Sequence, residues 1–246
     1  MKLTIAIPTY RSPDVLANCI SSLFTNTDVL RYHPRVIIIN NGDMPVTNIG
    51  RGGEHIEIHD QERNLGWMKS INFALDRTIT SDYFCMMNDD LLFIPGANDF
   101  WSKLLGTLDE PEVGLVGPSS NFVAGYQNAW WHSPWPRVET GYIIGMLSVI
   151  DFSLFQEIGG LDEKLPGGDD LDLSMQVRKK GYKLVAVRDA YVHHIGSQTG
   201  KREQPDYWDS HRHQAETYNA IMKKHGVKEY MNMVNWNPIP WEAREA

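Results

Sequence analysis

The first 120 residues alternate between short apolar runs and segments in which apolar residues recur every three or four positions. The apolar runs Leu3–Ile7, Val36–Ile39 and Tyr83–Met87 predict strands buried on both faces. Pro8 is expected to close the first of them. Helical spacing follows Pro13 and returns over Lys69–Arg77, and each helix has one apolar stripe. The alternation predicts an α/β fold with a mostly parallel sheet flanked by helices.

The second half of the chain alternates less regularly. The apolar segment Gly141–Phe152 predicts a strand, and Leu184–Val187 and Ala190–His193 predict two more. A polar segment from Tyr207 to His225 has the spacing of a helix. We expect one domain over residues 1–200, with halves of about 1–95 and 96–200, and a helical and aromatic extension over residues 201–246 packed on the same domain.

Two groups of acidic residues interrupt this apolar framework. Asn88, Asp89 and Asp90 directly follow the most apolar strand, and ligands of parallel sheets bind at the carboxyl ends of strands. The triplet could be a polar turn, or it could hold a divalent cation that bridges phosphate oxygens. Asp169 and Asp170 open a predicted helix, where they could act as N-caps. Repulsion among close carboxylates also raises the pKa of at least one of them toward the range of a general base.

Residues 126–136 form a loop-like segment rich in aromatic side chains. Its three tryptophans are Trp130, Trp131 and Trp135, and their spacing follows neither a strand nor a helix. Exposed rings of this kind would stack on a sugar, whereas buried ones would form a small satellite core.

Composition narrows the range of partners. The chain has 246 residues and a formal net charge of −8, without a long run of Lys or Arg, so a nucleic acid partner is unlikely. We find no apolar stretch of membrane-spanning length and no signal peptide after Met1, and we therefore expect a cytoplasmic protein with no membrane span. Cys19 and Cys85 are expected to be buried free thiols.

Eight segments of the chain resemble, in order, the family 2 glycosyltransferases of the GT-A fold, a Rossmann-like α/β fold. The resemblance extends from Leu3 to about Thr199. The segments are IAIPTYRSPDVLANCISSLF, VIIINNGD, NLGWMKSINFAL, YFCMMNDD, GLVGP, GYIIGMLSVIDFSLFQEIGGLDE, GGDDLDLSMQVRKKGYKL and AYVHHIGS.

The resemblance implies a set of site residues. Asn88-Asp89-Asp90 takes the place of the metal-binding acidic motif, with Asp90 as the best ligand for Mn²⁺ or Mg²⁺ and Asn88 where many relatives carry Asp. His194 falls on a further metal-ligand position. Asp169 and Asp170 fall on the catalytic acidic pair, with Asp170 as the base. The residues implied to line the donor pocket are Pro8, Thr9, Tyr10, Arg11, Asn40, Asn64, Gly66, Lys69 and Asp89. Asn40 replaces an Asp that commonly contacts the nucleobase.

The implied activity is metal-dependent, inverting transfer of a sugar from a UDP-, GDP- or dTDP-linked donor to a glycan or another hydroxyl acceptor. Trp130, Trp131 and Trp135 are candidates for stacking on the acceptor. One alternative is a catalytically silent nucleotide- or carbohydrate-binding module. A nucleotidyltransferase of similar fold would normally show a Gly- and Arg/Lys-rich signature near its first strand, which is missing. A zinc hydrolase would have to use His193, His194, His211 and His213, whose spacing matches no recognised zinc motif.

Overall fold

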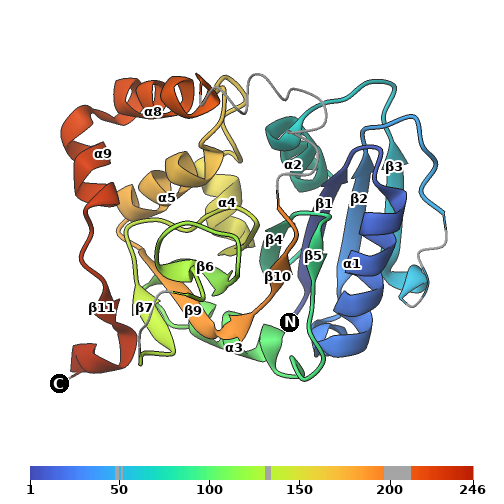
Figure 1. The fold of residues 1–246 in the computed structure, drawn as a ribbon, viewed down its shortest axis with the longest axis horizontal. Helices are drawn as coiled ribbons and strands as arrows, with labels where there is room; N and C mark the ends of the chain where they lie inside the picture. Colours follow the sequence, from blue (N-terminus) through green and yellow to red (C-terminus); the bar gives the residue numbers. More distant parts are fainter. Residues whose placement is uncertain (48–49, 51, 131–133, 197–211, 246) are drawn as a thin grey trace.

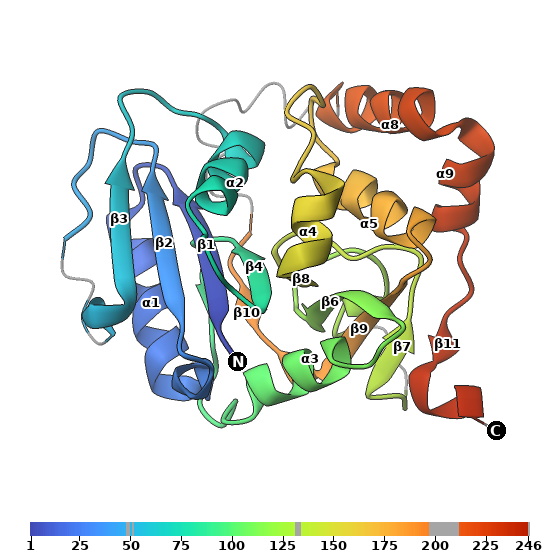
Figure 2. The same cartoon turned by 180° about the vertical axis from the view of Figure 1, so that it is seen from behind.

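The structure is a computed structural model that describes residues 1–47, 50, 52–130, 134–196 and 212–245. Its strands are β1 (Leu3–Thr9), β2 (Arg35–Asn40), β3 (Ile56–Asp60), β4 (Tyr83–Met87), β5 (Leu91–Leu92), β6 (Val113–Ser119), β7 (Arg137–Glu139), β8 (Leu147–Asp151), β9 (Lys183–Tyr191), β10 (His193–His194) and β11 (Ile239–Pro240). Its α-helices are α1 (Pro13–Asn26), α2 (Trp67–Asp76), α3 (Phe100–Leu108), α4 (Phe152–Ile158), α5 (Asp169–Lys179), α8 (Arg212–His225) and α9 (Val227–Val234). Figures 1 and 2 show the molecule from its two sides.

Nine of the described strands form one sheet, in the order β11-β7-β9-β6-β8-β4-β1-β2-β3. Strands β1 to β4 run parallel to one another, and β6 and β9 have the same direction because β8 lies antiparallel between β4 and β6. Only β7 and β8 run the other way. The expected α/β fold with a mostly parallel sheet is confirmed. The carboxyl ends of β1, β2, β3, β4, β6 and β9 consequently share one edge, called the site edge below.

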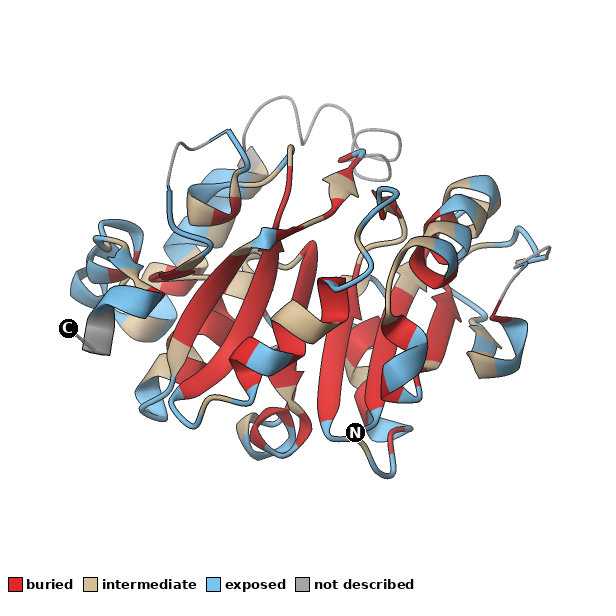
Figure 3. Cartoon of the chain, turned by 90° about the horizontal axis from the view of Figure 1, so that it is seen from below, coloured by how far each residue is buried: buried red, intermediate tan, exposed pale blue. Residues whose placement is uncertain are grey.

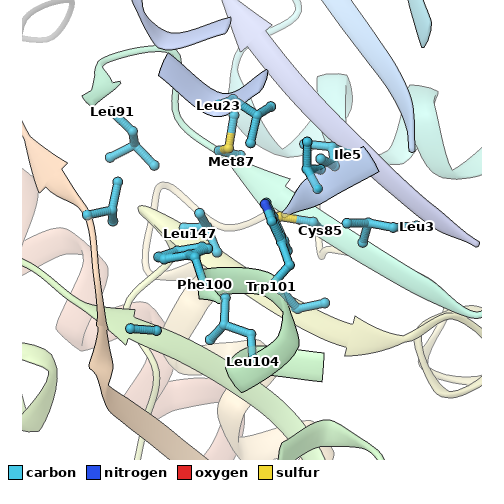
Figure 4. Packing of buried hydrophobic residues seen from close by; sticks show 14 of the residues in the cluster. Leu3, Ile5, Leu23, Cys85, Met87, Leu91, Phe100, Trp101, Leu104 and Leu147 are labelled. Carbon is cyan, nitrogen blue, oxygen red and sulfur yellow. The ribbon is translucent and has the colours of Figure 1, made fainter. Parts of the chain in front are cut away.

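Helices cover both faces of the sheet. Helices α1 and α3 share one apolar cluster with the sheet, and α2, α4 and α5 share the other. In Figure 4, Phe100, Trp101 and Leu104 of α3 pack close to Cys85 and Met87 of β4. Figure 3 shows the strands as a buried layer between helices whose outer surfaces are exposed. Cys19 and Cys85 are buried and unbridged, as expected.

The C-terminal helices α8 and α9 pack on the outer side of α5 (Figure 1). A small apolar cluster joins them, built from Leu171 and Met175 of α5, Ile221 of α8 and Met233 of α9. Strand β11 then adds to the edge of the sheet through β7. The described part of the extension therefore lies against the helix that carries Asp169 and Asp170.

Three of the predicted elements were wrong in extent. In Gly141–Phe152 only β8 is a strand, because the N–H groups of Ile143, Ile144 and Gly145 donate to side-chain oxygens and not to a neighbouring strand. Strand β1 continues through Pro8, because Thr9 still pairs with Asn40 of β2.

Strand β9 is also one strand where two were expected. Between Val187 and Tyr191 its pairing with β6 shifts register, so that the intervening polar residues bulge without ending the strand. The polar pair Arg188 and Asp189 is held by backbone hydrogen bonds to Pro136. Of the helix expected over Tyr207–His225, the described part is α8, and the residues before Arg212 lie outside the described residues.

Candidate active site

The acidic segment after β4 is anchored to the end of β1. The hydroxyl of Thr9, the last residue of β1, donates a hydrogen bond of 2.6 Å to Asp89 Oδ2. Thr9 is buried and Asp89 is partly buried. Because two parallel strands that are neighbours in the sheet end side by side, the contact joins two segments that the sequence places 80 residues apart.

Asn40, at the end of β2, is 3% exposed and uses its amide within the protein. Its Nδ2 donates to Met44 O at 3.0 Å and to Asp60 Oδ1 at 2.7 Å, and its Oδ1 accepts from Gly42 N at 3.2 Å. Asn40 therefore shapes the turn after β2. The exposed acid beside it is Asp60, the last residue of β3, which we did not identify from the sequence.

The remaining residues of the expected donor pocket lie around the same edge. Arg11 has a left-handed backbone conformation (φ 52°), and its guanidinium is paired with Asp43, with Nε 2.8 Å from Oδ1. Tyr10 lies under that guanidinium, 5.1 Å from ring centroid to Cζ, and Pro8 precedes them in β1. Asn64 accepts the Gly66 N–H at 2.8 Å just before α2 begins, and Lys69 is exposed in the first turn of α2.

Asp90 and His194 form a buried pair across the small sheet of β5 and β10. Asp90 is 5% and His194 is 8% exposed. His194 Nε2 lies 3.1 Å from Asp90 Oδ1 and 3.3 Å from Asn88 Nδ2. Asp90 Oδ2 accepts the Gly196 N–H at 3.0 Å, whereas Oδ1, although close to His194, has no aligned hydrogen bond. A buried carboxylate oxygen without a hydrogen bond is costly unless a cation occupies the position beside it.

These residues fit a divalent cation. The ring of His194 has its Nδ1 2.9 Å from Phe122 O, which places the proton of neutral His194 on Nδ1 and leaves the Nε2 lone pair facing Asp90. Although burial lowers the pKa of His194, the neighbouring Asp90 carboxylate outweighs it and raises the pKa overall. Among the described residues no three His, Cys, Asp or Glu side chains gather as a metal group. A Mg²⁺-like site needs only one or two protein carboxylates when phosphates complete it.

Asp169 and Asp170 are the first two residues of α5, and each is fixed by a different element. Asp169 Oδ2 accepts the indole N–H of Trp67, the first residue of α2, at 2.8 Å. Asp170 accepts two backbone N–H groups, from Leu171 at 2.8 Å and from Gly145 at 3.3 Å. Both carboxylates lie at the positive end of the α5 dipole, where negative charge is stabilised.

The two carboxylates border an apolar cavity and repel each other. The cavity has a volume of about 10 Å³, room for about one water molecule, and Met86, Leu115 and Ile143 line it. Burial and the charge of Asp170 raise the pKa of Asp169 to about 7, although the hydrogen bond from Trp67 favours the charged form. Burial also raises the pKa of Asp170, against its backbone hydrogen bonds. The pair therefore carries a proton more readily than ordinary carboxylates do.

The Asp169→Asn variant is expected to be more stable than the wild type at alkaline pH and equally stable in acid. Because the pKa of Asp169 is raised on folding, the wild type loses stability as the pH rises from about 4 through about 7. Asn cannot ionise, so the variant does not lose this stability. At about pH 8 its free energy of unfolding should exceed that of the wild type by about 2 kcal/mol, after allowance for partial solvent screening. Urea unfolding at several pH values measures the difference, and a difference independent of pH would contradict the assignment.

Two consecutive residues connect the Asn88–Asp90 segment to the acidic pair Asp169 and Asp170. Met146 O accepts the backbone N–H of Asn88 at 2.9 Å, and Gly145 N donates to Asp170 Oδ2 at 3.3 Å. Neighbouring Cα atoms are about 3.8 Å apart. The segment before β8 thus holds the two acidic groups side by side at the site edge.

Asp172, the third acid of α5, belongs to a different environment. It is 1% exposed and turns away from the site toward α8. Its Oδ1 lies 2.6 Å from His225 Nε2 and 2.8 Å from Lys224 Nζ, and Oδ2 accepts from Gln176 at 2.8 Å. Lys224 also reaches Asp162 at 2.7 Å. Asp172 therefore holds the end of α8 against α5.

The double substitution Lys224→Met with His225→Leu is expected to lower the free energy of unfolding by about 3–5 kcal/mol, because it leaves the buried Asp172 carboxylate without a cationic partner. Adding Asp172→Asn to this variant should restore much of the loss, since no buried charge then remains. Urea unfolding of the three proteins provides the measurement. Further destabilisation by Asp172→Asn would show that Asp172 is stabilised in some other way.

Two tryptophans of the aromatic segment lie within the described residues, and both are exposed. Trp130 is 76% exposed and Trp135 is 36% exposed, while Trp131 lies outside the described residues. The satellite-core interpretation does not fit Trp130, whose ring is open to solvent. His193 is partly buried beside Tyr191, and His211 lies outside the described residues.

The sequence comparison identifies the family. A model of Glycosyl transferase family 2 matches residues 4–161, well over half of the chain. The chain therefore belongs to glycosyl transferase family 2. The matched range includes Asn88, Asp89 and Asp90 and ends before Asp169, Asp170 and His194.

Individual relatives are distant. An uncharacterized protein of Mycobacterium bovis is 27% identical over 177 residues, which cover 67% of this chain and 64% of the relative. The chain thus spans slightly less than two thirds of that protein. The O-antigen chain rhamnosyltransferase RfbN of Salmonella typhimurium is 20% identical over 231 residues, which cover 85% of this chain and 71% of RfbN.

Solved structures of glycosyltransferases share the fold. The mannosyltransferase PcManGT from Pyrobaculum calidifontis, solved with GDP-Man and Mn²⁺, superposes with a TM-score of 0.68 at 16% identity, over 96% of this chain and 70% of that one. TarS residues 1–349 of S. aureus, solved with UDP-GlcNAc, gives 0.68 at 15% identity, over 96% and 72%. Among the described helices, none has the length and apolar character needed to cross a membrane.

Proposed function

We propose that this chain is a divalent-metal-dependent, inverting glycosyltransferase that moves a sugar from a nucleoside-diphosphate donor to an acceptor hydroxyl. The observation that carries the proposal is the connection through Gly145 and Met146, which sets Asp170 beside the Asn88–Asp90 segment. A transferase needs these two acidic groups close together, one for the donor diphosphate and one for the acceptor. Family membership and the fold shared with PcManGT and TarS support the same reaction class.

The donor would lie along the ends of β1, β2 and β4. Pro8, Thr9, Tyr10, Arg11 and Asn40 surround the nucleotide, with Asn64, Gly66 and Lys69 at the start of α2. Lys69 is exposed, and the start of a helix favours anions. Asp89 is fixed by Thr9 and so holds the segment that carries the metal ligands. UDP-, GDP- and dTDP-linked sugars are the donors to test.

Asp90 and His194 would hold Mn²⁺ or Mg²⁺, with Asn88 beside them. When bound, the cation would supply positive charge to the diphosphate leaving group. The unbonded Asp90 Oδ1 and the Nε2 lone pair of His194 are the chain's own atoms that fit this role.

Asp170 would act as the base. Its two backbone hydrogen bonds leave lone pairs on both oxygens, so it can accept a proton without losing its position. The acceptor oxygen attacks the sugar C1 from the face opposite the diphosphate and gives its proton to Asp170, while the bond from C1 to the phosphate oxygen breaks. Trp130 and Trp135 would stack on the acceptor, and Trp131 is a third candidate.

A donor screen tests the proposal. UDP-, GDP- and dTDP-linked sugars are each offered to the wild type with Mn²⁺ and with EDTA, and both binding and release of nucleoside diphosphate are measured. We expect one nucleotide to bind in a metal-dependent way. NMR of the product then reports whether the anomeric configuration is inverted. If no nucleotide sugar binds under either condition, the transferase proposal fails.

A further inference from the structure

Trp67 connects the donor-side helix α2 to the catalytic pair on α5. It is the first residue of α2, directly after the Asn64–Gly66 segment, and its Nε1 donates to Asp169 Oδ2 at 2.8 Å across 102 residues of sequence. Trp67 also lines the cavity that Asp169 and Asp170 border. Both Trp67 and Asp169 are only partly exposed, so the contact is shielded from bulk water.

The indole N–H of Trp67 affects the ionisation of Asp169 as well as its position. An indole N–H can donate a hydrogen bond but cannot accept one. It therefore stabilises Asp169 as a carboxylate and cannot accept the O–H of protonated Asp169. Asp170 is fixed separately by Gly145 and Leu171. The two acids are thus held by different elements, and the charge on Asp169 increases the affinity of Asp170 for a proton.

Few other charged groups face the pair within the described residues. On α5 the nearest is Asp172, whose charge is compensated by Lys224 and His225 of α8. From the segment before β8, Tyr142 interacts with Asp170, and its pKa is raised mainly by burial. The other residues that line the cavity are apolar or uncharged. Trp67 is therefore the side-chain donor through which α2 acts on the protonation of the pair.

We propose that Trp67 is a positioning residue for the transfer reaction proposed above: its indole N–H keeps Asp169 ionised beside Asp170 and thereby strengthens Asp170 as the base. Asp170 alone receives the acceptor proton. Asp169 supplies the neighbouring negative charge, and Trp67 lowers the pH at which that charge is present. The inference rests on the proposed function and adds a residue that acts on Asp170 through Asp169.

The test is the pH profile of the Trp67→Phe variant. Without the N–H, the transfer rate at about pH 7 should fall about 10-fold. The acid limb of the profile should move up by about one pH unit. The rate at about pH 9 should approach that of the wild type, and the donor KM should change little. In the Asp169→Asn background, Trp67→Phe should have no further effect on the rate.

Trp101→Phe is the matched control. Trp101 is a buried core residue whose Nε1 donates to Thr27 Oγ1 at 3.1 Å, so the same substitution removes an indole hydrogen bond on the opposite face of the sheet from the cavity. It should lower stability and leave the pH profile unchanged. A loss of rate in Trp67→Phe that is equal at all pH values, or that persists in the Asp169→Asn background, would overturn the proposal.

An NMR measurement that does not depend on enzymatic activity separates this inference from the proposed function. The NMR signal of the Trp67 indole N–H should shift with pH as Asp169 ionises and should stop shifting in Asp169→Asn. If the wild type turns over no nucleotide sugar but the signal titrates, the contact stands and the transferase proposal fails. If the signal does not titrate, the Trp67 proposal is wrong even for an active enzyme.

Discussion

The Asp170→Asn variant is expected to bind the nucleotide-sugar donor as tightly as the wild type and to lose sugar transfer by about 10²- to 10⁴-fold, the range of a general base. Asn has the shape of Asp and can still accept one of the two backbone hydrogen bonds, from Leu171 or Gly145. The start of α5 should therefore stay in place. What is lost is the oxygen that takes the proton from the acceptor hydroxyl.

Transfer is measured as nucleoside diphosphate released in the presence of acceptor, and binding by calorimetry with the donor and Mn²⁺. Glu163→Gln is the matched control: Glu163 is an exposed acid in the loop before α5 that accepts a hydrogen bond from Asn72 at 2.9 Å. It should keep full activity. If Asp170→Asn transfers sugar at a rate near that of the wild type, Asp170 is not the base, and Asp169 becomes the residue to examine.

The sequence was informative wherever a local pattern determines structure. The strand Tyr83–Met87 was predicted with its observed bounds because a five-residue apolar run is buried on both faces. The start of α1 followed from Pro13, and its buried face followed from the apolar stripe that includes Leu16 and Cys19. The convergence of Thr9 and Asp89 follows from the rule that parallel strands end at one edge, so this part of the candidate site could be expected without coordinates.

Contacts between distant side chains could not be predicted in this way. Trp67 lies within a segment that resembles the family, yet nothing local indicates that its indole reaches Asp169. In the sequence, Asp172 forms one acidic cluster with Asp169 and Asp170. In the structure, the rotation of helix α5 directs Asp172 toward α8, where Lys224 and His225 compensate its charge. Gly168 shows the same limit: its φ of 73° and the close approach of Thr217 explain the glycine only after α8 is in place.

The Asp90→Asn variant is expected to abolish the dependence of donor binding on metal. Asn can still accept the Gly196 N–H through its Oδ1, so the turn after β10 should persist. The variant removes the charge at the buried oxygen that has no hydrogen bond in the structure. Loss of a residue that only orients a metal ligand costs about 10- to 100-fold in metal affinity, and loss of a ligand should cost at least as much.

The measurement is calorimetric titration with UDP, GDP and dTDP, each with Mn²⁺ and with EDTA. In the wild type, EDTA should weaken binding of the preferred nucleotide. In Asp90→Asn, binding should be weak under both conditions, because the metal contributes only when Asp90 can hold it. Asp82→Asn is the matched control, since Asp82 precedes the amino end of β4, binds the Lys2 N–H and lies at the opposite edge of the sheet. A normal response to Mn²⁺ in Asp90→Asn would place the cation elsewhere or show that His194 holds it without Asp90.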